Sequence, residues 1–246
     1  AVAIYGVGAQ INSLVITFST AVSSVFAPRV NKIAAENAPD RDKKLTALFI
    51  RVGRIQYLIL MLIVSGFVVF GKYFITDIYS TVEYAQAYPV ALLLILPSFV
   101  PLIQNLGIEI QRSMNKHQIR SIIYLIMAIL NVGISIPLAK KFGPVGAALG
   151  TAIGLILTNI LFMNIYYQKG LGINVISFWK SILSLSKGMI IPALLGTWIA
   201  NTMAFNNIGI YVLMIVAYSL VYCGSMWMFG MNMEERNMIF QTFKKI

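Results

Sequence analysis

The chain has 246 residues, of which 59% are hydrophobic and 11% charged, with a net charge of +11 and a mean hydropathy of +0.81. A soluble globular domain is roughly 45–50% apolar and about 25% charged, and a chain of this length could not hide so large an apolar excess from water. These values exclude a soluble protein and predict an integral membrane protein. One cysteine and one histidine exclude disulfides and the usual Cys/His metal sites, so we expect no metal and no cofactor.

The apolar residues fall into seven stretches, each long enough to cross a bilayer as a helix. They predict an all-α fold, a polytopic membrane helix bundle that forms a single domain over residues 1–246. The predicted spans are approximately 3–27, 55–76, 87–111, 119–139, 144–167, 186–205 and 209–229.

The basic residues of the loops predict the orientation of these spans. Of the 19 lysines and arginines, 16 fall on one side of the predicted membrane and 3 on the other. Because basic loops stay in the cytoplasm, we expect the N-terminus of the chain outside and the C-terminus inside. The net charge is then a topology signal, and nucleic acid is not an expected partner.

The chain opens on Ala1 and is apolar at once, without a charged segment or a small-residue cleavage site before it. This pattern does not fit a signal peptide. It predicts that the sequence is the C-terminal part of a longer protein.

Residues 172–187 separate two of the spans and repeat at helical spacing. Ile173, Ile176, Trp179 and Leu183 recur on one side, with serines and lysines opposite. The pattern predicts either a helix lying in the cytoplasmic interface or an ordinary, slightly long start of the sixth span.

Polar residues form a stripe along the first span. Their spacings of three and four place them on one helical face. Such a stripe predicts either the wall of a hydrated path or hydrogen bonds between helices. The stripe consists of Gln10, Ser13, Thr17, Thr20 and Ser24, with Asn12, Ser19 and Ser23 beside it.

The third span contains Pro97 and Pro101, which remove helical hydrogen bonds and predict a kink or hinge. Below them, four residues share a predicted face, with Gln104 close by. Glu109 is the only acidic residue inside a predicted span, and it is close enough to pair with Arg112. It is either a functional charge in a cavity or part of an ordinary ion pair where the helix leaves the membrane. The face consists of Pro101, Asn105, Glu109 and Arg112.

The stretch FGPVGAALGTAIG opens the fifth span. Gly146, Gly150 and Gly154 recur every four residues, which predicts a close-packing ridge against the fourth span or another helix. A phosphate loop is excluded, because no strand precedes the glycines and no GK[ST] follows. No Ser/His/Asp set or paired carboxylates appear either, so the sequence does not predict an enzyme.

A family resemblance rests on SMNKHQIRS, on ILNVGISIPLAKKFGPVGAALGTA and on YYQKGLGINVISFWK. Together with the opening AVAIYGVGAQINSLV and FAPRVNKIA, these segments resemble the C-terminal half of Wzx-type oligosaccharide flippases of the MATE-like MOP exporter superfamily. The likeness runs from residue 1 to about residue 187. It implies a protein of about fourteen helices in two lobes that work by alternating access.

By the same resemblance, the cargo would be an undecaprenyl-diphosphate-linked oligosaccharide, flipped from the inner to the outer leaflet of a bacterial cytoplasmic membrane for surface polysaccharide biosynthesis. Expected partners are this lipid, the bilayer and the polysaccharide polymerase machinery. Arg29 and Arg112 are then candidates for binding the diphosphate, and Arg51 and Arg54 are weaker candidates. Two alternatives stay open: a MATE-type cation-coupled drug antiporter, and a membrane polysaccharide polymerase or glycosyltransferase.

Overall fold

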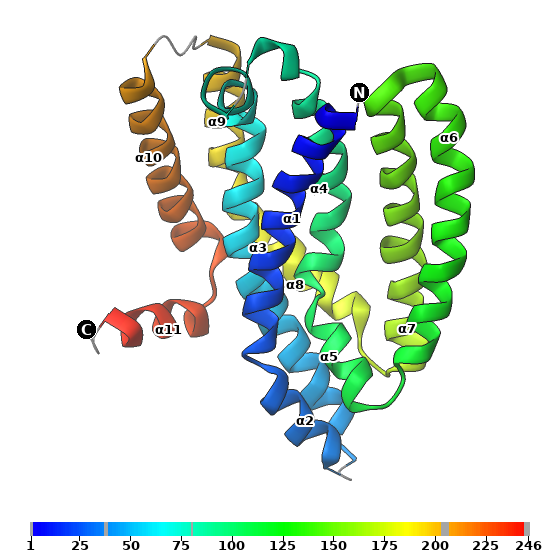
Figure 1. The fold of residues 1–246 in the computed structure, drawn as a ribbon. Coiled ribbons are helices and arrows are strands. Elements are labelled where there is room, and N and C mark those ends of the chain that lie inside the picture. The colour runs from blue at the N-terminus through cyan, green and yellow to red at the C-terminus, as the bar shows by residue number, and fades with distance from the viewer. Residues whose placement is uncertain (1, 37–38, 80, 203–206, 244–246) are drawn as a thin grey trace.

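The computed structural model describes residues 2–36, 39–79, 81–202 and 207–243, and every regular element in these ranges is a helix. Figure 1 shows the longer helices standing side by side as a bundle. Within the described ranges, five helices are long and apolar enough to cross a membrane, or six if one bent pair is counted as a single span. The predicted class, a multi-pass helical membrane bundle, is therefore confirmed, whereas the count of seven spans stays a prediction.

The centre of the bundle is formed by α1 (Val2–Ser24), α3 (Arg41–Tyr73), α4 (Ala87–Ile103) and α8 (Val175–Ser186). Helix α1 lies along α4, and α3 packs on both α4 and α8. Phe49 and Val52 of α3 meet Ile103 and Phe178 in one buried apolar cluster. This cluster holds the elements that carry the polar residues described below.

Two helices at one end of the bundle differ from the predicted spans. The first span ends at Ser24 and is followed by the short helix α2 (Ala27–Ala35), and α3 begins at Arg41 rather than near residue 55. Residues 41–54 form an amphipathic helical segment that the sequence did not predict because of its charges. Leu45, Leu48, Phe49 and Val52 are buried on one side at helical spacing, so this segment packs on its neighbours.

The third predicted span is broken. Helix α4 ends at Ile103, α5 runs over Leu106–Ser113, and the two are bent by 47° across Gln104 and Asn105. Before α4, the chain forms two short helical turns, η1 (Phe74–Tyr79) and η2 (Val82–Tyr84). Because of the bend, the face predicted from Pro101 to Arg112 is not continuous.

Helix α6 (His117–Leu155) contains a complete reversal of the chain at Gly143, where φ is 61° and ψ −137°. This left-handed conformation favours glycine because it has no Cβ. After Gly143 the helix runs back beside itself and continues through η3 (Ile156–Phe162) into α7 (Met163–Gly170), as the hairpin on the right of Figure 1 shows.

The predicted glycine ridge lies between the two arms of this hairpin. A Cβ on Gly150 would lie 2.7 Å from the Cα of Ser135, and one on Gly146 would lie 3.0 Å from the backbone nitrogen of Ala139. Gly154 faces Asn131 one turn further on. The fifth predicted span therefore packs against the fourth through its glycines.

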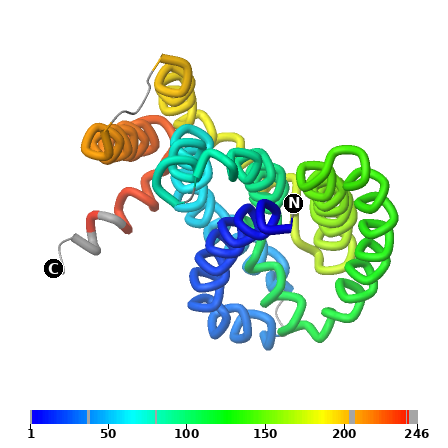
Figure 2. The backbone as a smooth tube through the Cα atoms, turned by 45° about the horizontal axis from the view of Figure 1, so that its top comes forward, coloured from blue at the N-terminus to red at the C-terminus, as the bar shows by residue number. Residues whose placement is uncertain are grey.

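The remaining helices follow α8: η4 (Lys187–Met189), α9 (Ile190–Thr202), α10 (Ile208–Ser225), η5 (Met226–Gly230) and α11 (Met233–Phe243). Helices α9 and α10 stand on the side of the bundle away from the α6 hairpin (Figure 2). The apolar face predicted for 172–187 stays a prediction as a surface that meets the membrane interface. Ile173 is buried, but Ile176 and Leu183 are exposed.

The face of α8 that packs on α3 is a different one, because α8 carries apolar side chains on two faces and spacing alone does not say which of them meets a neighbour. The buried residues are Val175, Phe178, Ile182 and Leu185. The helical segment continues through η4 into α9, so it leads directly into the next candidate span.

Candidate functional site

The polar stripe of α1 lies on the exposed side of that helix. Ser13 donates to the carbonyl oxygen of Ala9 at 3.0 Å, and Thr17 donates to that of Ser13 at 2.9 Å. Thr20 and Ser24 also bond within α1. These four hydroxyls are thus satisfied by carbonyl groups of their own helix, and they form an exposed polar surface.

Gln10 lies at one end of the stripe and accepts a hydrogen bond from the Tyr79 hydroxyl at 3.2 Å. Asn12 lies beside the stripe and is half-buried, and its Oδ1 is buried without a hydrogen-bond partner among the described residues.

The opposite side of α1 carries a buried polar cluster at the break between α4 and α5. Ser19 donates to the carbonyl oxygen of Leu102 at 2.9 Å, which satisfies a group in the last turn of α4. The Asn105 amide lies 3.4 Å from the Ser19 hydroxyl. Side chains of α1 therefore stabilise the interruption at Gln104 and Asn105, which lies beyond the predicted hinge residues Pro97 and Pro101, both inside α4.

Gln56 of α3 completes this cluster, and the sequence did not single it out. Its Nε2 donates to the Ser23 hydroxyl at 2.6 Å and to the Ser19 carbonyl at 3.1 Å. The sequence does contain a signal for this role. Gln56 is a single amide in the apolar sequence of α3, and polar groups within a membrane span need hydrogen-bond partners.

Gln104 lies on the other side of the break. Its Nε2 donates to Oδ1 of Asn164 at 2.8 Å, an atom that also accepts from the Trp179 indole at 3.1 Å. The Asn164 amide in turn donates to two carbonyls of η3. Gln104 therefore ties α4 to the hairpin and is separate from the α1 stripe.

The charged candidates lie at the end of the bundle where α2 packs on α5. Arg112 donates to Glu109 at 2.9 Å, and their side chains are 66% and 22% exposed. Arg29 of α2 is also exposed. The structure thus separates the predicted site residues into an exposed stripe, a buried break and a charged end, which do not converge on one point.

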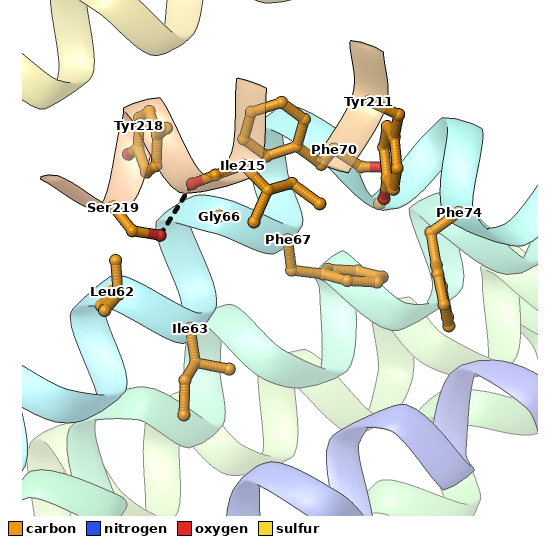
Figure 3. Close-up of a pocket in the computed structure, with 11 residues that line it drawn as sticks. Leu62, Ile63, Gly66, Phe67, Phe70, Phe74, Tyr211, Ile215, Tyr218 and Ser219 are labelled. Atoms are coloured by element: carbon orange, nitrogen blue, oxygen red, sulfur yellow. Dashed lines mark hydrogen bonds between the residues drawn. The ribbon is translucent and has the colours of Figure 1, made fainter. Parts of the chain in front are cut away.

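An apolar groove follows the seam between α3 and α10, and we call it the α3–α10 groove. It consists of two adjoining cavities of about 370 Å³ and about 870 Å³, which share Leu62 and Ile63. The smaller one, shown in Figure 3, lies between Phe67 and Phe74 of the α3 side and Tyr211 and Ser219 of α10. The Ser219 hydroxyl donates to the Ile215 carbonyl of its own helix, so it offers no free donor to the cavity and the wall is largely apolar.

The larger cavity extends the groove toward α11. Phe18 of α1 forms part of its wall, as do Tyr222 and Cys223 of α10 and Trp227 of η5. Since Phe18 follows Thr17 in the sequence, the apolar groove begins beside the polar stripe of α1.

A buried ion pair closes the end of the larger cavity. Arg54 of α3 donates to Glu235 of α11 from Nε at 2.5 Å and from Nη2 at 2.7 Å, and both side chains are 7% exposed. Asn232 and Glu235 bond each other reciprocally at the start of α11, through the backbone N–H of each, in the manner of a capping box. The sequence NMEE was a signal for this cap, but nothing in it pointed to Arg54.

The described part of the chain contains no group of three or more His, Cys, Asp or Glu side chains arranged to hold a metal ion. Comparison with known proteins found no match: no family model, no curated protein and no solved structure is similar to the chain.

Proposed function

We propose that the chain is the C-terminal part of a flippase that moves a lipid-linked oligosaccharide, an undecaprenyl-diphosphate-linked glycan, from the inner to the outer leaflet of a bacterial cytoplasmic membrane. The observation that carries the proposal is the contact of two unlike surfaces along α1. Its hydroxyl stripe is exposed, and Phe18 beside Thr17 enters the wall of the apolar groove.

A lipid-linked sugar needs both kinds of surface. Its glycan must cross the hydrocarbon layer, where unpaired polar groups are costly, while its isoprenoid chain gains nothing by leaving an apolar environment. Hydroxyls that are already bonded to their own helix offer weak, interchangeable contacts to a sugar. The groove offers a separate apolar path for the chain.

The proposed topology has seven crossings. It counts the bent pair α4 and α5 as one span, and it counts the segment His117–Gly170 as two spans that meet at Gly143. In this topology the excess of lysine and arginine on one side supports an N-terminus outside and a C-terminus in the cytoplasm.

The alternative of a cation-coupled drug antiporter is less well supported. Such a carrier needs a membrane-buried acid that can release its proton or sodium ion. Among the described residues, the acids with the least exposed side chains are Glu109 and Glu235, and each already pairs with an arginine.

The test uses the full-length protein in a strain that lacks its own flippase. Restored surface polysaccharide supports the proposal. Normal levels of inner-leaflet precursor after deletion of the gene would contradict it. Drug resistance that appears on expression and is lost in Glu109→Gln would support the antiporter instead.

A further inference from the structure

The carboxylate of Glu235 lies where three donors converge. Nε and Nη2 of Arg54 donate to it at 2.5 and 2.7 Å, and the backbone N–H of Asn232 donates to Oε2 at 2.9 Å. These donors form an anion site, and the structure shows it filled by a side chain of the same protein.

We propose that Glu235 is a built-in stand-in for a phosphate, and that the phosphate headgroup of a lipid whose chain lies in the α3–α10 groove displaces it from Arg54. The inference rests on the proposed function, because it names the residue that receives the headgroup of the cargo.

The guanidinium of Arg54 is held in place by groups other than Glu235. Its Nη1 donates to the Ser181 carbonyl at 2.8 Å and lies 3.2 Å from the Ser181 hydroxyl, and its Nη2 lies 3.3 Å from the Gly230 carbonyl. These contacts to α8 and η5 keep the fork oriented when the carboxylate leaves. A planar fork of N–H groups fits two phosphate oxygens as well as it fits a carboxylate.

The groove determines what kind of phosphate can arrive. Glu235 is itself part of the wall of the larger cavity, together with Trp227, Met231 and Met238. Apart from Glu235, these are apolar or largely apolar side chains. A lipid chain lying among them would therefore place its headgroup at Arg54, whereas a free phosphate would gain nothing from the groove.

Helix α11 is attached to the bundle in a way that allows it to move away when Glu235 leaves Arg54. It projects from the bundle in Figures 1 and 2, and Met233 and Phe240 on it are exposed. Its other contacts with the bundle include the Arg51–Met238 contact at 3.6 Å, the Trp227–Phe240 ring pair at 5.2 Å and a hydrogen bond of 3.2 Å from Arg236 to the Met228 carbonyl. The Arg54–Glu235 pair is the buried charged contact between α11 and α3, so displacement of Glu235 should loosen α11.

The experiment measures hydrogen exchange of the α11 amides and ligand binding for the full-length protein in phosphatidylcholine nanodiscs. Three probes are compared: farnesyl diphosphate, farnesol as the chain alone, and pyrophosphate as the headgroup alone. We expect farnesyl diphosphate to bind and to accelerate exchange in α11, with neither fragment doing so at the same concentration.

Variants assign the effect to the two residues. Glu235→Gln should accelerate α11 exchange without ligand and strengthen farnesyl diphosphate binding by about tenfold, because the competing charge is gone. Arg54→Gln should abolish binding, and Arg54→Lys, which keeps the charge but lacks the fork, should weaken it. Glu234→Gln is the matched control, since Glu234 is the adjacent acid on α11 and is exposed.

Unchanged binding in Glu235→Gln relative to Glu234→Gln would overturn the proposal and leave Glu235 as a structural anchor. Equal release of α11 by pyrophosphate would overturn the lipid as occupant. Because binding is read without transport, binding at Arg54 without restored surface polysaccharide would retain this site while refuting the proposed function. Restored polysaccharide without such binding would do the reverse.

Discussion

The hydroxyl of Ser19 in α1 donates a hydrogen bond of 2.9 Å to the carbonyl oxygen of Leu102, in the last turn of α4 before the helix breaks. This bond joins residues 83 positions apart. It ties the buried side of α1, opposite the exposed stripe, to the break between α4 and α5.

Replacing the buried Ser19 with alanine should lower the stability of the protein more than the same replacement at the exposed Ser24. Ser19→Ala removes the donor to Leu102 and the acceptor facing Asn105, a loss of about 1 kcal/mol for a hydrogen bond inside a membrane bundle. The thermal unfolding midpoint in detergent measures the effect. Ser24→Ala is the control, because the Ser24 hydroxyl bonds only within its own helix. Equal midpoints for the two variants would mean that the Ser19 cluster contributes nothing to the fold.

The glycine ridge of the hairpin makes a steric prediction. Gly150→Leu should sharply reduce accumulation in the membrane, because even a Cβ at this position would overlap Ser135 of the facing arm. Overpacking of this kind costs about 1–3 kcal/mol or more. Quantified protein in the membrane fraction measures the loss.

Gly133→Leu provides the matched control for the ridge, since a Cβ at Gly133 would have no atom within 4 Å. It should accumulate like the natural protein. If Gly150→Leu accumulated normally but failed to transport, the contact between the two arms would have to move during the transport cycle.

The exposed stripe of α1 makes the opposite kind of prediction. Ser13→Leu combined with Thr17→Leu should leave the unfolding midpoint nearly unchanged, because both hydroxyls are exposed and bond only within α1. Transport should fall several-fold if a glycan passes along this face, since the change adds apolar bulk and removes two polar contacts.

Leu14→Phe adds bulk at a neighbouring exposed position without changing polarity, and it should transport normally. Normal transport by the Ser13/Thr17 double variant would place the stripe against lipid or another helix instead of along a path.

The helices themselves were predictable because apolar length is a strong signal and each crossing satisfies its own backbone. Apolar length does not predict which face of a helix is buried or which neighbouring helix it packs against. The charges of residues 41–54 obscured the amphipathic start of α3. Helix α8 has two apolar faces, and the one that is buried inside the bundle is not the one that was predicted to meet the membrane interface.

The candidate site was harder still. Polar residues of α1 were recognised as a group, but Ser19 and Ser23 turned out to belong to a buried cluster with Gln56, separate from the exposed stripe. Arg54 and Glu235 lie 181 positions apart. A single sequence contains no local signal for such a pair, because it depends on how α11 returns to α3.

The two prolines of α4 make the last prediction. Each lacks a backbone N–H, so neither can donate to the carbonyl four residues before it, and both lie inside α4, which ends at Ile103. In the variant with both Pro97→Ala and Pro101→Ala, the two bonds can form and α4 stiffens. If this segment bends during transport, the rate should fall several-fold while the amount of protein in the membrane changes little. Pro89→Ala is the control, because Pro89 lies in the first turn of α4, where no helical bond is lost. Equal losses of transport and of accumulation in the double variant would mean that Pro97 and Pro101 shape the static fold and that the bend does not move.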